Sequence, residues 1–169
     1  MPDYNVTEYL RIAAAVVLPH IGGLYGATIT KDQIKGWYKT LNKPPWTPPN
    51  WVFGPMWTSL YTAMGYASYL AWKDGGGFKN AMLPLGSYAV GLGLNWMWTP
   101  VFFGRHKLGP SVAIILSCLG MTIGTAYLYY PINETACFLN FPLIAWLTLA
   151  SSVNIYVWLN NKEKGNGDS

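Results

Sequence analysis

Charged residues are scarce in this sequence of 169 residues. Asp, Glu, Lys and Arg together make up 11% of the chain, whereas ordinary soluble domains carry about 25%. So few charges cannot cover the surface of a water-soluble domain. A disordered chain is excluded as well, because 51% of the residues are hydrophobic and the net charge is only +4. The composition therefore indicates a folded protein that is surrounded by lipid.

Cysteine and histidine are also scarce, with two of each in the chain. Cys118 and Cys137 fall inside hydrophobic runs, which favours packed thiols over a framework of disulfides. His20 lies within a hydrophobic run and His106 lies outside one, so these four residues cannot form a metal-ligand cluster. Neither a nucleophile motif nor a phosphate-binding glycine loop occurs. We therefore expect no metal, no cofactor and no conventional catalytic group.

The few charges are clustered, and they leave five long runs without Asp, Glu, Lys or Arg. A helix needs about 20 mostly apolar residues to span a bilayer. A soluble helical bundle would place Lys and Glu along the outer face of each helix. A membrane β-barrel would instead show segments of about ten residues with strict alternation. Neither pattern is present in the five runs, which are 12–30, 44–72, 80–104, 108–133 and 135–161.

The sequence therefore predicts an all-α fold, built as an integral membrane bundle of five transmembrane helices. A single domain is expected to cover residues 1–169. A loop over residues 30–47 is expected to join the first helix to the second. The five expected helices are residues 9–29, 48–72, 81–103, 109–130 and 134–159.

Basic residues are distributed unevenly between the two sides of this bundle. Five crossings place the first loop, the third loop and the C-terminal tail on one side, which carries eight of the eleven Lys and Arg residues. The positive-inside rule puts that side, with the C-terminus, in the cytosol. A scaffold whose basic face recruits protein partners is another interpretation of the same charges. The eight residues are Lys31, Lys35, Lys39, Lys43, Arg105, Lys107, Lys162 and Lys164.

Asp, Glu, Lys and Arg are absent from the middle of each expected helix, which argues against ion-coupled pumps and voltage sensors. Aromatic residues are abundant instead, at 16%. Trp57 and Tyr61 are four residues apart and share a helix face, as do Trp146 and Ala150. Rings grouped around a small residue can form an apolar cavity for a flat ligand. The alternative is that these rings only pack one helix against another.

Glycine pairs at a spacing of four residues occur on two of the expected helices. Gly22 and Gly26 lie on the first helix, and Gly120 and Gly124 lie on the fourth. Such pairs let membrane helices approach closely, either within one chain or between two copies. The sequence therefore predicts close helix packing and leaves a homodimer open.

Long motifs rich in tryptophan and proline give the most specific signal. The segment KPPWTPPNW covers residues 43–51, and it follows the pair Trp37 and Tyr38. The other motifs are PMWTSLYTAMGY at 55–66, LNWMWTPVFFG at 94–104 and AWLTLASSVNIYVW at 145–158. In these motifs the chain resembles the translocator protein family, also called the peripheral benzodiazepine receptor or tryptophan-rich sensory protein family.

This resemblance implies a five-helix protein, often dimeric, in the outer mitochondrial membrane of a eukaryote or in the envelope membrane of a bacterium. It implies a translocator or receptor for flat lipophilic ligands: porphyrins such as protoporphyrin IX, cholesterol, and benzodiazepine- and isoquinoline-type drugs. The alternative function that it implies is light-dependent porphyrin degradation by Trp57 and Trp146. The expected partners are the lipid bilayer, one such small molecule and a second copy of the chain, with no nucleic acid.

The resemblance also assigns residues to a site. The first loop covers the pocket in the family, which gives Trp37 and Tyr38 the role of a lid. The loose sterol pattern of the family is met by Val153, Tyr156 and Lys162. The pocket residues that carry over, together with Tyr61 from the helix face of Trp57, are Trp46, Trp57, Tyr61, Asn95, Trp146 and Ala150.

Overall fold

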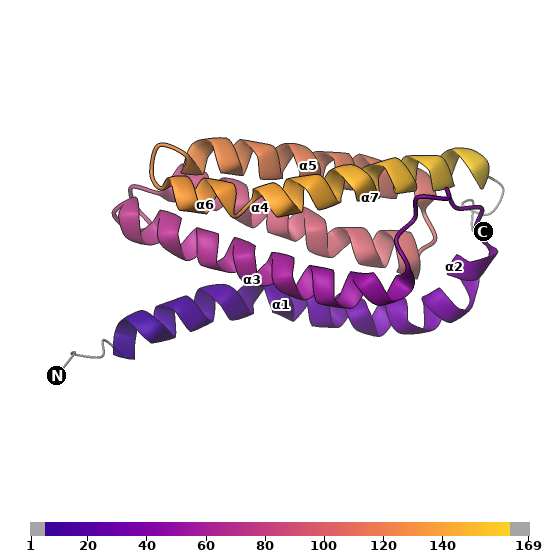
Figure 1. Ribbon diagram of the computed structural model, residues 1–169, viewed down its shortest axis with the longest axis horizontal. Helices are drawn as coiled ribbons and strands as arrows, with labels where there is room; N and C mark the ends of the chain where they lie inside the picture. Colours follow the sequence, from indigo (N-terminus) through magenta and orange to yellow (C-terminus); the bar gives the residue numbers. More distant parts are fainter. Residues whose placement is uncertain (1–5, 163–169) are drawn as a thin grey trace.

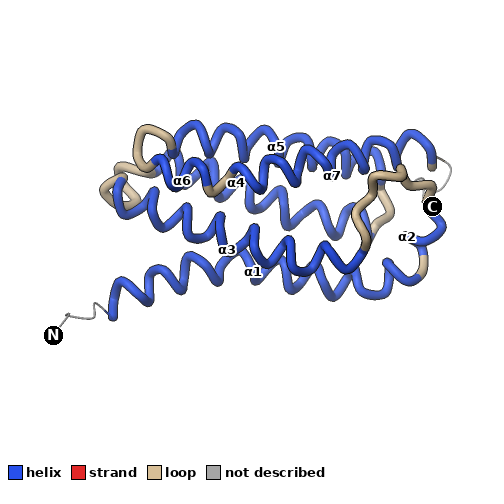
Figure 2. Tube along the Cα trace, viewed as in Figure 1, coloured by secondary structure: helices blue, strands red, loops and turns tan. Residues whose placement is uncertain are grey.

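The computed structural model describes residues 6–162, and Lys164 and the two ends of the expected domain lie outside that range. Within it every regular element is a helix and no strand is present (Figure 2). The long helices run side by side along the longest axis of the molecule (Figure 1). The elements are α1 (Val6–Lys35), α2 (Trp37–Thr40), α3 (Asn50–Asp74), α4 (Met82–Thr99), the π-helix η1 (Pro100–Gly104), α5 (Leu108–Tyr129), α6 (Glu134–Phe138) and α7 (Phe141–Asn160).

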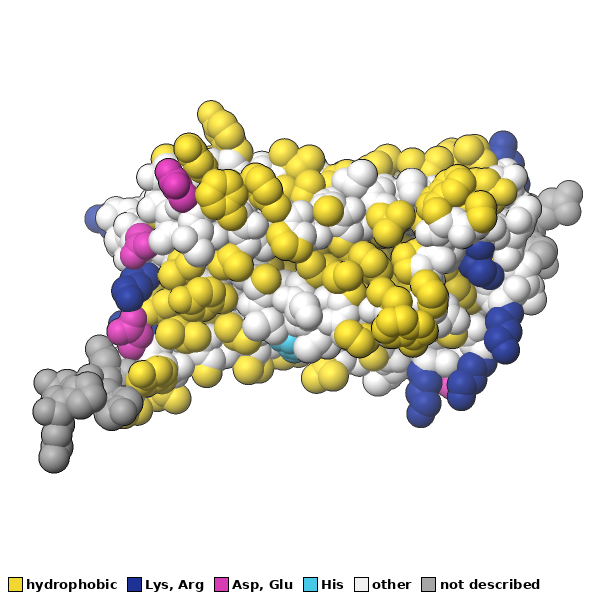
Figure 3. All heavy atoms as spheres, in the orientation of Figure 1, with side chains coloured by type: hydrophobic (Ala, Val, Ile, Leu, Met, Phe, Trp, Pro, Cys, Tyr) yellow, Lys and Arg dark blue, Asp and Glu magenta, His cyan; other side chains and the backbone are white. Residues whose placement is uncertain are grey.

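Hydrophobic side chains cover the outside of the bundle. On α1, Val17, Ile21 and Leu24 are each more than half exposed. Figure 3 shows hydrophobic side chains spread over the middle of the molecule, whereas the charged side chains lie at its two ends. Within residues 6–162, α1, α5 and the segment Glu134–Asn160 are long and apolar enough to span a bilayer. The protein is therefore an all-helical integral membrane protein, as predicted.

The first helix is longer than expected, and the expected loop is shorter. α1 continues to Lys35 and α2 occupies Trp37–Thr40, so the prediction of a loop over the whole of 30–47 is wrong. The charged residues that begin at Lys31 exclude this segment from the hydrocarbon of the membrane, but Lys and Gln are good helix formers. Charge therefore marked where the apolar segment ends and not where the helix ends. The loop proper covers residues 41–49.

Prolines shape two of the other expected helices. In the third, Pro100 begins η1, in which the amide of Arg105 donates to the carbonyl of Pro100 at 2.9 Å. In the fifth, Leu139 and Asn140 separate α6 from α7, and Pro142 stands in the first turn of α7. Because proline has no amide hydrogen, it cannot donate the backbone hydrogen bond that would join it to the preceding helical turn. The single uninterrupted helix expected over 134–159 is therefore wrong.

Glycine allows α1 to approach its neighbours closely. A Cβ atom on Gly65 of α3 would lie 2.5 Å from the carbonyl oxygen of Ala15 on α1. Gly22 and Gly26 of α1 contact side chains of α4, which confirms close packing within the chain. The other predicted glycine pair, on α5, has no neighbouring atom within 4 Å of where its Cβ atoms would stand. That pair faces away from the rest of the chain.

Candidate functional site

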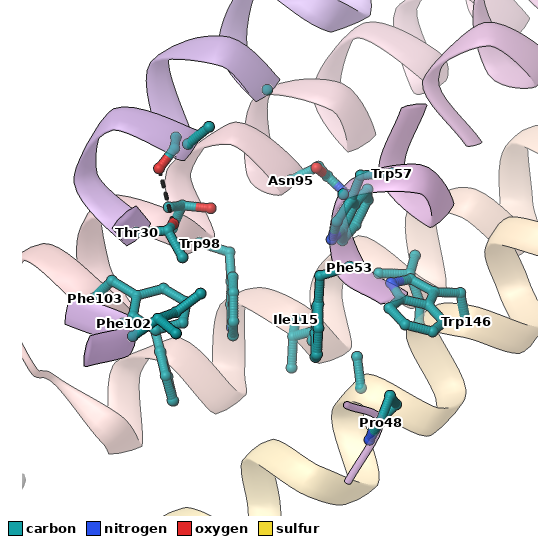
Figure 4. Close-up of a pocket in the computed structure, with 18 of the residues that line it drawn as sticks. Thr30, Pro48, Phe53, Trp57, Asn95, Trp98, Phe102, Phe103, Ile115 and Trp146 are labelled. Atoms are coloured by element: carbon teal, nitrogen blue, oxygen red, sulfur yellow. Dashed lines mark hydrogen bonds between the residues drawn. The ribbon is translucent and has the colours of Figure 1, made fainter. Parts of the chain in front are cut away.

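A cavity of about 400 Å³ lies inside the bundle, at the end where the 41–49 loop crosses (Figures 1 and 4). Residues of α1, α2, α3, α4, η1, α5 and α7, together with Pro48 of the 41–49 loop, form its wall. The volume lies within the range of about 300–1,000 Å³ that is usual for small-molecule sites. A cavity in this position, between membrane helices, has the apolar surroundings that an apolar ligand needs.

Aromatic rings from α2, α3, α4, η1 and α7 form much of the wall (Figure 4). The rings of Trp57 on α3 and Trp146 on α7 meet edge to face, with centroids 6.4 Å apart. Phe53 is 5.5 Å from Trp146 and Tyr61 is 5.2 Å from Trp57, between ring centroids. On the α4 side, Trp98 is stacked on Phe102 at 4.8 Å. These rings offer flat apolar surfaces on which a planar ligand can stack.

A few polar groups lie among these rings. The hydroxyl of Tyr61 donates to Oδ1 of Asn95 at 2.8 Å. Nε1 of Trp98 donates to Oδ1 of Asn154 at 2.8 Å, and thereby joins α4 to α7. Nε1 of Trp146 is buried without a hydrogen-bond partner. Leaving a buried donor unpaired is unfavourable by about 1–3 kcal/mol.

The cavity opens sideways between α1 and α3. The lining residues from α4, α5 and α7 are buried or half-buried, and the exposed ones all belong to α1 or α3. These exposed residues recur at helical spacing, one row on α1 and one row on α3. The mouth of the cavity is therefore a slot between the two helices, on the outside of the bundle. The exposed lining residues are Leu24, Ala27 and Lys31 of α1, and Asn50, Gly54 and Thr58 of α3.

The 41–49 loop is held against the end of α7. The backbone amide of Asn42 donates to Oδ1 of Asn161 at 2.8 Å, and Nδ2 of Asn161 donates back to the carbonyl of Asn42 at 2.9 Å. Nζ of Lys43 donates to the carbonyl of Tyr38 at 2.6 Å and lies 4.6 Å from the centroid of its ring. Burial raises the pKa of the Tyr38 hydroxyl, so Tyr38 stays neutral where it lines the cavity.

Most of the residues singled out from the sequence come together at this cavity. Trp37 does not line it, because its ring is stacked on His106 with centroids 4.0 Å apart. Trp46 lies against Tyr156 at 5.7 Å, and its Nε1 donates to Oγ of Ser152 at 3.2 Å. Both stand outside the lining, as does the exposed Lys162. The expected residues that do line the cavity are Tyr38, Trp57, Tyr61, Asn95, Trp146, Ala150 and Val153.

Other lining residues were not expected. Phe53 lies four positions before Trp57, and Trp98 lies three positions after Asn95, so helical spacing could have found both. Ile115 and Cys118 of α5 also contribute, and no motif marks them. In the described part of the chain, no three His, Cys, Asp or Glu side chains come together as metal ligands.

A comparison with protein families identifies the wider group. The model described as the TspO/MBR family matches residues 15–159. The chain belongs to this family. All of the cavity-lining residues fall within the part of the chain that matches the TspO/MBR model.

Individual relatives come from animals and from an archaeon. Translocator protein from Bos taurus is 43% identical over 152 residues, which cover 89% of this chain and 90% of the relative. Translocator protein from Homo sapiens is 41% identical over 144 residues, or 85% of each chain. The tryptophan-rich protein TspO from Archaeoglobus fulgidus is 33% identical over 153 residues, covering 90% of this chain and 97% of the relative.

Proposed function

We propose that this TspO/MBR protein binds flat lipophilic molecules in the cavity between its helices and acts as their membrane translocator or receptor. The proposed ligands are porphyrins such as protoporphyrin IX, cholesterol, and benzodiazepine- and isoquinoline-type drugs. The observation that carries the proposal is the cavity of about 400 Å³, whose largely apolar wall includes eight Phe, Trp and Tyr side chains. The name of the mammalian relatives, translocator protein, supports the transport role.

Stacking and burial supply the binding free energy in this proposal. Transfer of apolar ligand surface contributes about 25 cal/mol for each Å² removed from water. Each well-placed aromatic contact adds about 0.5–1.5 kcal/mol. These contributions favour a rigid planar ligand, which loses little conformational entropy on binding.

The cavity can be tested by filling it. Ala150 lines the cavity on α7, so Ala150→Leu places a branched side chain in the ligand's space. Ala113→Leu is the matched control, because Ala113 is exposed on α5 and does not line the cavity. Binding of protoporphyrin IX is measured by quenching of Trp fluorescence in phosphatidylcholine nanodiscs.

We expect Ala150→Leu to weaken protoporphyrin IX binding by at least about tenfold, which equals about 1.4 kcal/mol, while Ala113→Leu binds as wild type does. Equal affinity of all three proteins contradicts the pocket assignment. Trp57→Leu provides a second variant, since it removes part of the wall without filling the space.

For cholesterol, the proposed site is this same cavity. Of the three residues that meet the loose sterol pattern, Val153 lines the cavity. Tyr156 packs against Trp46, and Lys162 lies beyond the end of α7. We therefore expect Ala150→Leu to reduce the binding of a radiolabelled sterol, and Lys162→Gln to leave it unchanged. The reverse result favours a separate sterol site at the end of α7.

The contact between Trp57 and Trp146 favours a second candidate function, light-dependent porphyrin degradation. An indole can donate an electron to an excited porphyrin only when the two are held close together. The two rings lie 6.4 Å apart on the wall where the ligand would stack. Bleaching of protoporphyrin IX under illumination is the assay. If the double variant with Phe at both positions bleaches at the wild-type rate, this function is excluded.

We also propose the placement of the protein in its membrane. Five crossings are made by α1, α3, α4 with η1, α5, and α6 with α7. The end that carries Lys31, Arg105 and Lys162 faces the cytosol, by the positive-inside rule. The membrane is the mitochondrial outer membrane in a eukaryote, or an envelope membrane in a bacterium. Protease added to intact mitochondria should remove a C-terminal tag, and protease added to intact bacterial spheroplasts should leave it whole. The opposite result in either system contradicts this orientation.

A homodimer is the last part of the proposal. Gly120 and Gly124 on α5 face away from the rest of the chain, which leaves their surface free for a second copy in the membrane. The mass of the protein in detergent, measured by light scattering, is the test. A dimer that becomes a monomer in the Gly120→Leu, Gly124→Leu variant is expected. A wild-type monomer contradicts this part.

A further inference from the structure

One charged residue stands at the wall of the cavity. Among the described residues that line it, Lys31 is the single Asp, Glu, Lys or Arg. The one ion pair within residues 6–162 joins Lys73 to Glu8, so Lys31 has no acidic partner in the described part of the chain. The remaining lining is apolar or carries neutral polar groups, with His20 held by the carbonyl of Val16. An unpaired cation beside an apolar cavity favours a ligand of opposite charge.

Lys31 lies at the mouth of the cavity rather than in its depth. It is exposed, and it follows Leu24 and Ala27 on the α1 edge of the slot. Asn50, a neutral polar residue of the opposite edge, belongs to the first turn of α3. Lys31 is also the first charged residue after the uncharged run of α1. This position lies where the hydrocarbon of the membrane meets water, and a lysine side chain reaches such a boundary with its ammonium group hydrated.

We infer that Lys31 makes the cavity selective for amphipathic ligands that carry a carboxylate on a flat apolar body. The body lies between the aromatic walls, and the carboxylate stays at the mouth, where it pairs with the Lys31 ammonium. A carboxylate placed deeper would lose its hydration without finding a cation, which is strongly unfavourable. The charge therefore sets both the orientation of the ligand and the preference for an acid over an ester. This inference rests on the proposed function of the cavity.

Lipid phosphate is the competing source of negative charge at this depth. A phospholipid carries two acyl chains beside its phosphate, whereas the cavity holds about 400 Å³. The lined space therefore suits a small acid better than a whole lipid. Lipid phosphate could instead be the natural partner of Lys31. In that case, replacing the lysine would not change the relative affinities for the acid and the ester of one small ligand.

The test compares one ring system with and without its charges. Protoporphyrin IX and its dimethyl ester share the flat body, and only the acid carries carboxylates. Their dissociation constants are measured by Trp fluorescence quenching at low salt in zwitterionic phosphatidylcholine nanodiscs. The variants are Lys31→Met, which keeps an unbranched side chain without the charge, and Lys31→Arg, which keeps the charge. Lys35→Met is the matched control, because Lys35 is exposed on the same helix and does not line the cavity.

We expect Lys31→Met to weaken binding of the acid by about fivefold, as is typical of a solvent-accessible ion pair, and to leave binding of the ester unchanged. Lys31→Arg and Lys35→Met should keep the wild-type preference for the acid, and added salt should reduce it. If the ratio of the dissociation constants for the acid and the ester is the same in wild type and Lys31→Met, the inference is overturned while the proposed function stands. If wild type binds neither compound, the proposed function fails and the inference falls with it.

Discussion

The single variants Trp98→Phe and Trp146→Phe compare the loss of a hydrogen-bonded indole with the loss of an indole that has no hydrogen bond. Both residues line the cavity, and each substitution removes the same atoms. Nε1 of Trp98 donates to Asn154 at 2.8 Å, whereas Nε1 of Trp146 is buried and has no partner. To a first approximation, the loss of buried ring surface is common to the two variants. The difference in their stability therefore reports the hydrogen bond.

The magnitude follows from what each variant leaves behind. Trp98→Phe breaks a hydrogen bond between α4 and α7, and it leaves Oδ1 of the buried Asn154 without its donor. Hydrogen bonds between membrane helices contribute about 0.6 kcal/mol on average and up to about 1.7 kcal/mol. Trp146→Phe breaks no such bond. We expect Trp98→Phe to be the less stable variant by about 1 kcal/mol, which is about 2–4 °C in Tm for a chain of this size.

The two buried free cysteines provide the assay. Cys118 and Cys137 react with a thiol-reactive fluorophore only when unfolding exposes them, so the labelling midpoint on heating in detergent gives Tm. A lower midpoint for Trp98→Phe than for Trp146→Phe is the expected order. Equal midpoints, or a lower midpoint for Trp146→Phe, would refute the assignment of bonded and unbonded indoles.

Two further predictions concern packing and the loop. Gly65→Val should prevent α1 from packing on α3, because its Cβ would lie 2.5 Å from the carbonyl oxygen of Ala15; the yield of monodisperse protein measures this. Gly86→Val, with no atom within 4 Å of its Cβ, should express as wild type does, and equal loss in both variants contradicts the packing argument. Asn161→Ala removes both hydrogen bonds to Asn42, so amide hydrogen exchange in residues 41–49 should accelerate with little change in Tm. Unchanged exchange there means that other contacts hold the loop.

Local periodicity accounts for much of the candidate site. Trp57 and Tyr61 lie on one face of α3 because they are four residues apart, and the same reasoning places Trp146 beside Ala150 on α7. Each of these residues lines the cavity. Uncharged runs likewise indicated where the long helices lie, because lipid excludes charge along their length.

Contacts between distant segments were beyond that reasoning. Asn42 meets Asn161 across 119 positions of the sequence, and helical spacing carries no information about such a pairing. Trp37 stacks on His106 rather than lining the cavity, because α2 places it against the segment that follows η1. Motif recognition identified Trp37 and Trp46 as site residues, but the path of the loop determines which surface each one covers.

The most direct test of the account is to map where a ligand attaches. An isoquinoline carboxamide bearing a diazirine is photolysed with the protein in nanodiscs, and the labelled peptides are identified by mass spectrometry. The account predicts labels on Trp57, Trp146 and Ala150, which line the cavity, and their loss when excess protoporphyrin IX is present. Labels confined to exposed positions of α5, such as Ile123 and Tyr127, would show that the ligand binds the outer surface of the bundle and would contradict the account.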